Sequence, residues 1–330
     1  AFNTAVGFAA GVAVTTGIKN TLIGGLAGDA ITTASQNTAV GYNALTATTT
    51  GAANTAVGFE ALDANTTAAN NTGIGWRALY TNTTGASNTA VGVQALDANT
   101  TGSDNVSVGL ATLTSDTLGN KSVAIGNYSL AYQNFTSATD TYNTAVGYQA
   151  GNRVTTGINN TLIGGLAGDA LTDADYNVAL GVGALTTDTL GSKSTALGSY
   201  ALSNQNFTSA TDAHNTAVGN NAGGAVTTGI NNTLIGSLAG DAITTASYSV
   251  AVGQGAATNT TTSSQGFTAV GADSLFTNTT GTDNVAVGRA SMYYNTTGAN
   301  NVAVGRSALQ ANTTASNNTA VGYSALIANT

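Results

Sequence analysis

Residues 54–70 read N-T-A-V-G-F-E-A-L-D-A-N-T-T-A-A-N, and this pattern returns along the whole chain. The five-residue word at its start occurs nineteen times, from residues 3–7 to residues 318–322, usually at a spacing of seventeen residues. A fixed period this short predicts one structural unit stacked on copies of itself. We therefore expect an all-β parallel solenoid of about nineteen seventeen-residue coils, with residues 1–330 forming a single repeat array.

The first five positions of the unit predict a short strand that ends in a bend. Position two is Thr or Val and position four is Val, Ile or Leu, an alternation typical of a strand with one buried face. We expect both positions to point inward, and position three, which is small in residues such as Ala56 and Gly73, to point outward. Glycine at position five suits a bend because it adopts positive φ without steric cost. The bend glycines include Gly58, Gly92, Gly126, Gly147, Gly219 and Gly322.

The rest of the unit predicts a second strand and a turn. Position nine is usually Leu, which we expect to point inward from that second strand. Positions twelve to fifteen often read Asn-Thr-Thr-Gly, which favours a turn. Each coil is thus predicted to hold two short strands and two turns. The predicted core includes Val57, Leu62, Val91, Leu96, Val123, Ile125, Val285 and Val287.

The spacing departs from seventeen residues at three places. One step, at Phe267, is longer by a single residue, and two others are twenty-one residues long. The two long steps contain the same insert, near residues 133–140 and 205–212, and we expect these inserts to protrude as loops. The duplication divides the array into sub-blocks 1–142, 143–214 and 215–330.

The composition narrows the class of protein. Charged residues make up 7% of the chain and hydrophobic residues 42%, and there is no Pro and no Cys. The abundance of Val, Ile and Thr favours strands over disorder, and the lack of Pro fits uninterrupted hydrogen-bonded ladders. The seven Lys and Arg residues are scattered, unlike those of a nucleic-acid-binding surface. No apolar run reaches eighteen residues and no signal peptide is visible, so this segment predicts no membrane insertion.

The repeated word also resembles a known family. Residues 122–126, S-V-A-I-G, and the variants N-T-A-V-G and N-V-A-V-G resemble the head repeat of YadA-like trimeric autotransporter adhesins, and similar repeats occur in phage tail fibres. The resemblance implies a left-handed parallel β-roll, three chains wide, that binds host surfaces. The period of seventeen is longer than is usual in that family, which implies a longer second half-coil. A coiled-coil stalk, a membrane anchor and a self-cleaving end are not recognisable in these residues.

A homotrimer is expected on physical grounds as well. Each coil offers only a few large inward side chains to offset the conformational entropy of ordering seventeen residues. Packing the small Ala and Gly face of one chain against neighbouring chains would bury more surface per coil. We therefore expect copies of this chain to be its main partner.

The titratable residues do not suggest catalysis. The chain has one His, His214, and one Glu, Glu60, so a Ser-His-Asp arrangement would depend on that single His. Asp29, Asp169 and Asp241 each follow a Gly, and we expect them to cap their own turns. Calcium held between coils is the alternative, and it would need six or more oxygen ligands. We expect no enzyme activity, no metal and no cofactor.

Two residue types provide candidate ligand or modification sites. Asn-x-Ser/Thr triplets mark Asn65, Asn82, Asn99, Asn295 and Asn312 as candidate glycan sites, although stacked Asn side chains could instead exchange amide hydrogen bonds from coil to coil. Flat aromatic faces with polar rims suit sugars. The candidate ligand-contact aromatics are Trp76, Phe135, Phe207, Tyr293 and Tyr294, with packing under the inserts as the alternative.

These observations favour a non-enzymatic structural and adhesive fibre segment. It would project from a cell or virion surface and bind a glycan or protein receptor through avidity. The first alternative is an extracellular filament, because neither end shows a distinct cap and open coils could stack head to tail. The second is an ice-binding solenoid with ordered rows of Thr. No nucleic-acid partner is expected.

Overall fold

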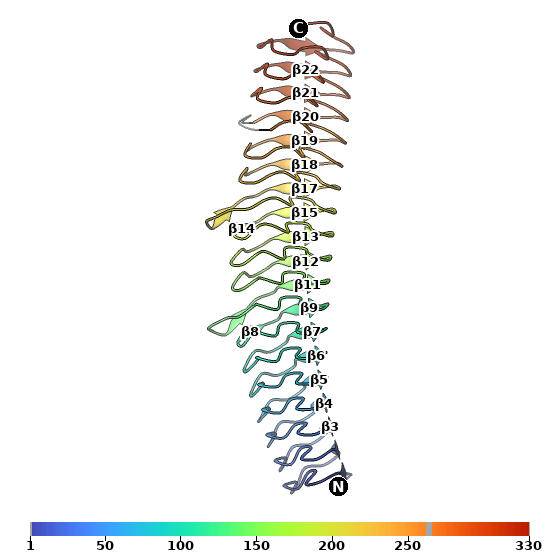
Figure 1. The fold of residues 1–330 in the computed structure, drawn as a ribbon, viewed down its shortest axis with the longest axis vertical. Coiled ribbons are helices and arrows are strands. Elements are labelled where there is room, and N and C mark those ends of the chain that lie inside the picture. Colours follow the sequence, from blue (N-terminus) through green and yellow to red (C-terminus); the bar gives the residue numbers. More distant parts are fainter. Residues whose placement is uncertain (1, 262–265, 330) are drawn as a thin grey trace. The chain divides into compact units, whose positions relative to one another are not determined.

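The computed structural model describes residues 2–261 and 266–329, and none of these residues is helical. The chain divides into two units, Ala1–Asn160 and Thr161–Thr330, which are described separately. Each unit is a parallel β-solenoid in which every coil contributes one three-residue strand, paired with the same strand of the next coil (Figure 1). The predicted fold class and the seventeen-residue coil are therefore confirmed.

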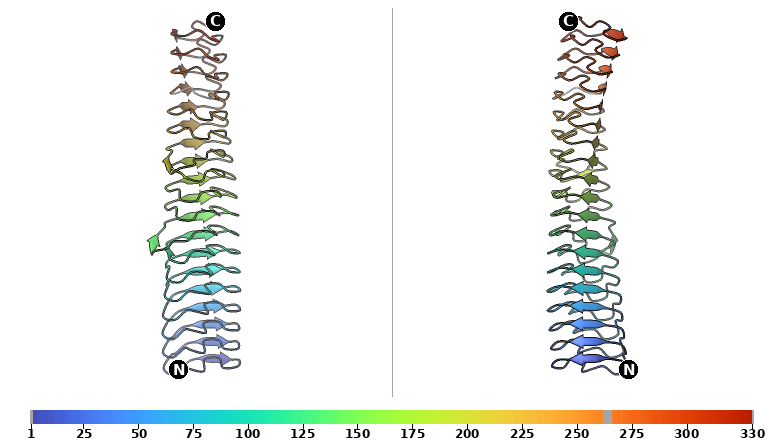
Figure 2. Two further views of the ribbon diagram at one scale, coloured as in Figure 1. Left: turned by 60° about the vertical axis from the view of Figure 1, so that its left-hand side comes forward. Right: turned by 90° about the vertical axis from the view of Figure 1, so that its right-hand side faces the viewer.

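The first unit contains nine main strands, which lie on one face of the coils (Figure 2). They are β1 Thr4–Val6, β2 Thr21–Ile23, β3 Thr38–Val40, β4 Thr55–Val57, β5 Thr72–Ile74, β6 Thr89–Val91, β7 Val106–Val108, β9 Val123–Ile125 and β11 Thr144–Val146. Two-residue strands β8 Gly119–Asn120 and β10 Thr139–Asp140 pair at the insert.

The second unit contains ten main strands in the same arrangement. They are β12 Thr161–Ile163, β13 Val178–Leu180, β15 Thr195–Leu197, β17 Thr216–Val218, β18 Thr233–Ile235, β19 Val250–Val252, β20 Thr268–Val270, β21 Val285–Val287, β22 Val302–Val304 and β23 Thr319–Val321. Its insert pairs β14 Gly191–Ser192 with β16 Thr211–Asp212. The inserts, which pair with β8 and β14, extend beyond the edge of neighbouring coils in their own unit, as predicted (Figure 1).

The predicted orientation of the main strands is wrong. The middle residue of each strand points inward: Ala56 and Ala90 are fully buried, whereas the flanking positions are more exposed. Six predicted core residues therefore lie on the outer face of the sheet, and Ile125 is 38% exposed. They are Val57, Val91, Val123, Ile125, Val285 and Val287. The large buried Leu at position nine already occupies the interior, so the inward position of the strand is small in most coils.

The inward Leu at position nine is confirmed, but the second strand is not. Leu62 and Leu96 are fully buried, as predicted. Each of them has a φ in the left-handed region, at 53° and 52°, so this part of the coil is a turn rather than a strand. The turn brings the Leu side chain across the coil interior, opposite the small residue of the strand. The Leu side chains and the small residues of the strands thus form much of the core, together with buried residues such as Ala61 and Ile31.

The large and small residues at positions three and nine are swapped in some coils. In most coils a small residue such as Ala56 faces a large one such as Leu62. In the coil that begins at Asn20, Leu22 occupies position three and Gly28 occupies position nine. A Cβ atom at Gly28 would lie only 2.8 Å from the Leu22 side chain. Each arrangement thus places one large side chain and one small residue at these two positions, in keeping with the close packing of protein interiors.

The bend after each main strand needs glycine for two reasons. At Gly58, φ is +144°, a conformation that residues with a side chain rarely adopt. A Cβ atom there would also lie 2.3 Å from the carbonyl oxygen of Gly75 in the next coil. The predicted bend glycines Gly58, Gly92, Gly126, Gly147, Gly219 and Gly322 all have positive φ.

Candidate functional site

A ladder of Asn side chains, buried in most coils, lies directly before most of the main strands. In the first unit the Asn71 side-chain amide donates to the carbonyl of Gly85, 2.8 Å away. Its Oδ1 accepts from the backbone N–H of Asn88 in the next coil, also at 2.8 Å. Asn54 makes the same pair of contacts with Ala68 and Asn71. This ladder satisfies backbone groups that the turns would otherwise leave unpaired in the interior.

A second ladder contains the five candidate glycan sites, Asn65, Asn82, Asn99, Asn295 and Asn312, all fully buried. The Nδ2 atom of Asn99 donates to Oδ1 of Asn82 at 2.8 Å and to the carbonyl of Gly102 at 3.0 Å. The atom that a glycan would modify is thus buried and hydrogen-bonded within the fold. The glycan prediction is contradicted for the folded coils, and the alternative of amide bonds passing from coil to coil is confirmed.

Each insert joins the solenoid through a buried polar cluster. In the first unit Gln133 Nε2 donates to Oδ2 of Asp116 at 2.6 Å and to Ser122 Oγ at 2.8 Å. Its Oε1 accepts from Asn143 Nδ2 at 2.9 Å. Burial raises the pKa of the Asp116 carboxyl above its ordinary value, against the lowering effect of the bond from Gln133. The second unit repeats the cluster with Asp188, Gln205, Ser194 and Asn215.

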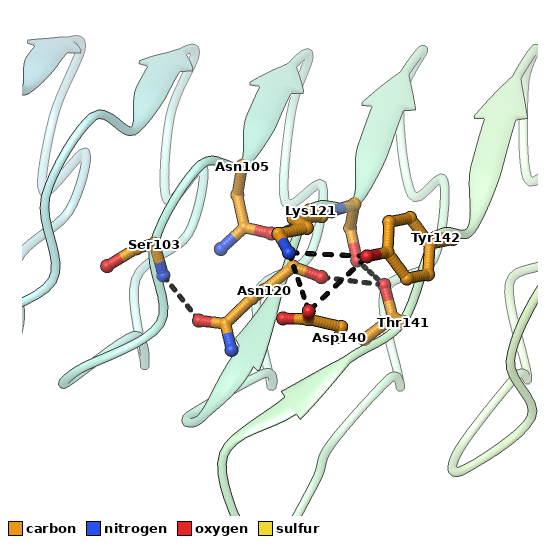
Figure 3. A network of polar contacts seen from close by, with 8 residues as sticks. Ser103, Asn105, Asn120, Lys121, Asp140, Thr141 and Tyr142 are labelled. Carbon is orange, nitrogen blue, oxygen red and sulfur yellow. Dashed lines mark hydrogen bonds and ion pairs between the residues drawn. The ribbon is translucent and has the colours of Figure 1, made fainter.

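The outer side of the first insert carries an ion pair (Figure 3). Lys121 Nζ donates to Oδ2 of Asp140 at 2.5 Å and to the hydroxyl of Tyr142 at 3.2 Å. The hydrogen bond from Lys121 lowers the pKa of Asp140 below its ordinary value. In the second unit Lys193 pairs with Asp212 in the same way, and His214 takes the place of Tyr142. His214 is exposed, so it lies at the surface of the insert.

The candidate ligand-contact aromatics separate into two groups. Phe135 and Phe207 are only 6% and 5% exposed because they pack beneath the inserts, so the prediction that they contact ligands is wrong. Trp76 is 42% exposed and lies beside Arg77, whose Cζ is 5.4 Å from the Trp ring centroid. Tyr294 is 52% exposed, and its ring meets that of Tyr293 edge to face at a centroid distance of 4.7 Å.

Tyr293 and Tyr294 border a hollow of about 220 Å³ in the second unit. Its lining comprises Asp273, Arg289, Ala290, Tyr293, Tyr294, Arg306, Ser307 and Gln310. Sequence reasoning identified the two Tyr residues but missed the two Arg residues. The available signal was the spacing of Arg289 and Arg306, which occupy the same position in successive coils.

A more neutral hollow of about 310 Å³ lies in the first unit beside the insert. It is lined by Ala111, Thr114, Tyr128, Ala131, Tyr132, Gln149 and Asn152. Asn152 Nδ2 donates to the Tyr128 carbonyl at 2.9 Å, which fixes one side of the hollow.

The described residues contain no cluster of three or more His, Cys, Asp or Glu side chains with the geometry of a metal site. Asp169 accepts a hydrogen bond from Thr186 Oγ1 at 2.6 Å, so its partner is the neighbouring coil rather than its own turn. Residues 2–261 and 266–329 include no apolar helix of membrane-spanning length. The chain matches no protein-family model, and a search among curated proteins finds no significant similarity.

Proposed function

We propose that this chain is the repeat segment of a non-enzymatic structural and adhesive fibre at a cell or virion surface. Copies of the chain associate laterally as a homotrimer and present surface sites to a glycan or protein receptor. The observation that carries the proposal is the outer face of each sheet, formed by positions two and four of the main strands. In every copy these positions are Thr, Val, Ile or Leu, and none is charged.

The outer face has the character of a surface that another sheet covers. Parallel sheets are normally covered on both faces, yet here one face is left open within each unit. Ile74 and Leu180 remain 39% and 43% exposed. The columns are in register from coil to coil, as for Val40 and Val57. A second copy of the chain fits this face best. The outer-face residues of both copies then repeat with the same period, and neither copy places a charged residue in the contact.

The inward position of Ala56 and its equivalents changes the predicted packing. Small residues do not form the contact surface, and the Thr and Val columns replace them. Covering a side chain that is about 40% exposed contributes roughly 0.6–1.2 kcal/mol, and several side chains in a column are less exposed, so nine coils contribute at most about 5–10 kcal/mol per column. Association costs roughly 4–15 kcal/mol. Stable assembly therefore needs the face to be continuous over many coils.

Size-exclusion chromatography with light scattering tests the assembly. We expect a mass of three chains, about 97 kDa from 32.2 kDa each. The double variant Ile74→Lys and Val91→Lys places two cations on the outer face and should weaken the trimer. Arg153→Glu, an exposed change away from that face, is the control. One chain per particle for the unmodified protein would refute lateral assembly, and failure to bind any cell, matrix or polysaccharide panel would refute the adhesive role.

Ice binding is a second candidate, favoured by the outward orientation of the Thr column. Thr38, Thr55 and Thr72 are aligned in register on adjacent parallel strands. Regular hydroxyl and methyl rows on a flat sheet could order water molecules. This candidate needs the face to be open, whereas the trimer covers it. Thermal hysteresis from a monomeric chain would favour ice binding over the fibre, and its absence would exclude ice binding.

A further inference from the structure

The hollow beside Tyr293 and Tyr294 concentrates positive charge on an acidic protein. The chain has a formal net charge of −8 and only seven Lys and Arg residues. Arg289 and Arg306 are the one pair of these cations that occupies the same repeat position in successive coils. The backbone N–H of Ser307 donates to the carbonyl of Arg289 at 3.0 Å, which holds the two coils in this register.

The two guanidinium groups have no carboxylate partner at ion-pair distance within the described residues. Three other cations do: Arg77 with Glu60, Lys121 with Asp140 and Lys193 with Asp212. Adjacent coils are about 4.8 Å apart, so stacked like charges repel. Asp273 also lines the hollow, which leaves two positive charges against one negative charge. A bound anion would relieve the repulsion.

The aromatic wall of the hollow is rigid on one side and open on the other. Tyr293 stacks on Phe276 with ring centroids 4.9 Å apart and planes inclined by 7°. Tyr294 crosses Tyr293 edge to face and keeps 52% of its surface exposed. Such a ring offers a flat apolar face with a polar edge, which suits the C–H face of a pyranose. Ser307 and Gln310 add hydrogen-bonding groups at the rim.

The size of the hollow restricts the ligand. Its volume of about 220 Å³ is below the roughly 300–1,000 Å³ of pockets that hold drug-sized molecules. We propose that Arg289, Arg306 and Tyr294 bind one acidic sugar unit of a polysaccharide. The guanidinium groups hold its carboxylate or sulfate, since Arg matches both anions through paired N–H donors. The Tyr294 ring carries the sugar ring. This inference deepens the proposed adhesive function and rests on it for its biological context.

Calorimetric titration of the full chain tests the site with two probes, oligogalacturonate for a carboxylate and a sulfated galactan oligomer for a sulfate. We expect binding of at least one probe and at least a tenfold loss in the double variant Arg289→Ala and Arg306→Ala. Tyr294→Ala should weaken binding of the same probe, and methyl-esterified oligogalacturonate should bind more weakly than the free acid. These side chains are exposed or lie at the rim, so circular dichroism should be unchanged.

Arg153→Ala is the matched control, because it removes one exposed positive charge from the other unit. It should leave binding unchanged. The site is refuted if neither probe binds at millimolar concentration, if the double Arg variant binds as the unmodified chain does, or if Arg153→Ala loses as much affinity. Surface attachment that survives the double Arg variant would overturn this site and leave the adhesive proposal standing. Probe binding without attachment to any surface would support this site and refute the adhesive proposal.

Discussion

Replacing each of two adjacent glycines in turn should show whether the bend after a main strand requires glycine. One of the two lies at the bend, and the other lies directly after it. Gly164 directly follows β12 and has φ at +135°, and a Cβ atom there would lie 2.5 Å from the carbonyl oxygen of Gly181. A Cβ atom at Gly165 would meet nothing within 4 Å. Gly164→Ala and Gly165→Ala therefore make the same chemical change at neighbouring positions with opposite surroundings.

The expected cost of Gly164→Ala follows from strain and crowding. Ordinary contact begins at 3.4 Å, so one coil must move by about 0.9 Å, the difference between 3.4 and 2.5 Å. That movement would stretch the 2.8 Å hydrogen bond from Gly181 N–H to the Ile163 carbonyl. A forbidden φ costs about 1–3 kcal/mol and overpacking another 1–3 kcal/mol, so the sum is about 2–6 kcal/mol. Gly165→Ala should be neutral or stabilising by up to about 1 kcal/mol.

Hydrogen exchange is the appropriate measurement, because repeat arrays need not unfold in one cooperative step. At 1.4 kcal/mol per factor of ten, Gly164→Ala should lower amide protection in residues 161–200 by at least about 25-fold. Gly165→Ala should leave it equal or higher. Equal amide protection in the two variants would refute the claim that the bend position must be glycine for neighbouring coils to stack.

Three further predictions concern the ladder, the core and the inserts. Asn71→Ala should cost about 2–6 kcal/mol of local stability by hydrogen exchange of the neighbouring coils, because the Gly85 carbonyl and the Asn88 N–H each lose a buried partner worth about 1–3 kcal/mol. An effect below about 1 kcal/mol would contradict the ladder. Leu96→Ala should cost about 2–5 kcal/mol, whereas Val91→Ala should cost clearly less because its side chain already meets solvent; equal costs would contradict the strand orientation. In carbon-13 NMR the Asp116 carboxyl should titrate above 3.8 and the Asp140 carboxyl below it. The stability that Asp116 contributes is then largest below pH 3.8 and is lost as the pH rises through its raised pKa. The stability that Asp140 contributes is present above pH 3.8 and is lost as the pH falls through its lowered pKa. Identical titration of the two carboxyl groups would contradict both environments.

The sequence period was sufficient to predict the coil, the bend and the inserts. Glycine at position five and Leu at position nine each have one physical explanation, and both were predicted in the right places. The strand orientation was not, because the alternation of Thr, Ala and Val is compatible with either face pointing inward, and hydrophobicity alone favours Val. The sequence signal that could have decided the orientation is the pair Leu22 and Gly28. Position three is large where position nine is small, which is explained if the two positions face each other in the interior.

The candidate site was harder to predict than the fold. An Asn-x-Thr triplet has the same letters whether Asn82 is exposed or fully buried in a ladder. Phe135 and Tyr294 are both aromatic residues at variable positions, and only the packing of the insert buries the first. Arg289 and Arg306 became informative once the register placed their coils in contact.

The way in which neighbouring windings are joined has a mechanical consequence. Adjacent windings within a unit are held by hydrogen bonds spread around the coil, such as Thr55 N–H to the Asn71 carbonyl at 2.8 Å and Leu62 N–H to the Ala78 carbonyl at 3.0 Å. A pull along the stacking direction would load the end winding first and detach windings one at a time. Each detached winding of seventeen residues can extend to roughly 56–61 Å, against a rise of about 4.8 Å when stacked. A tether built this way would lengthen in steps under drag and dissipate a sudden load before its attachment point failed.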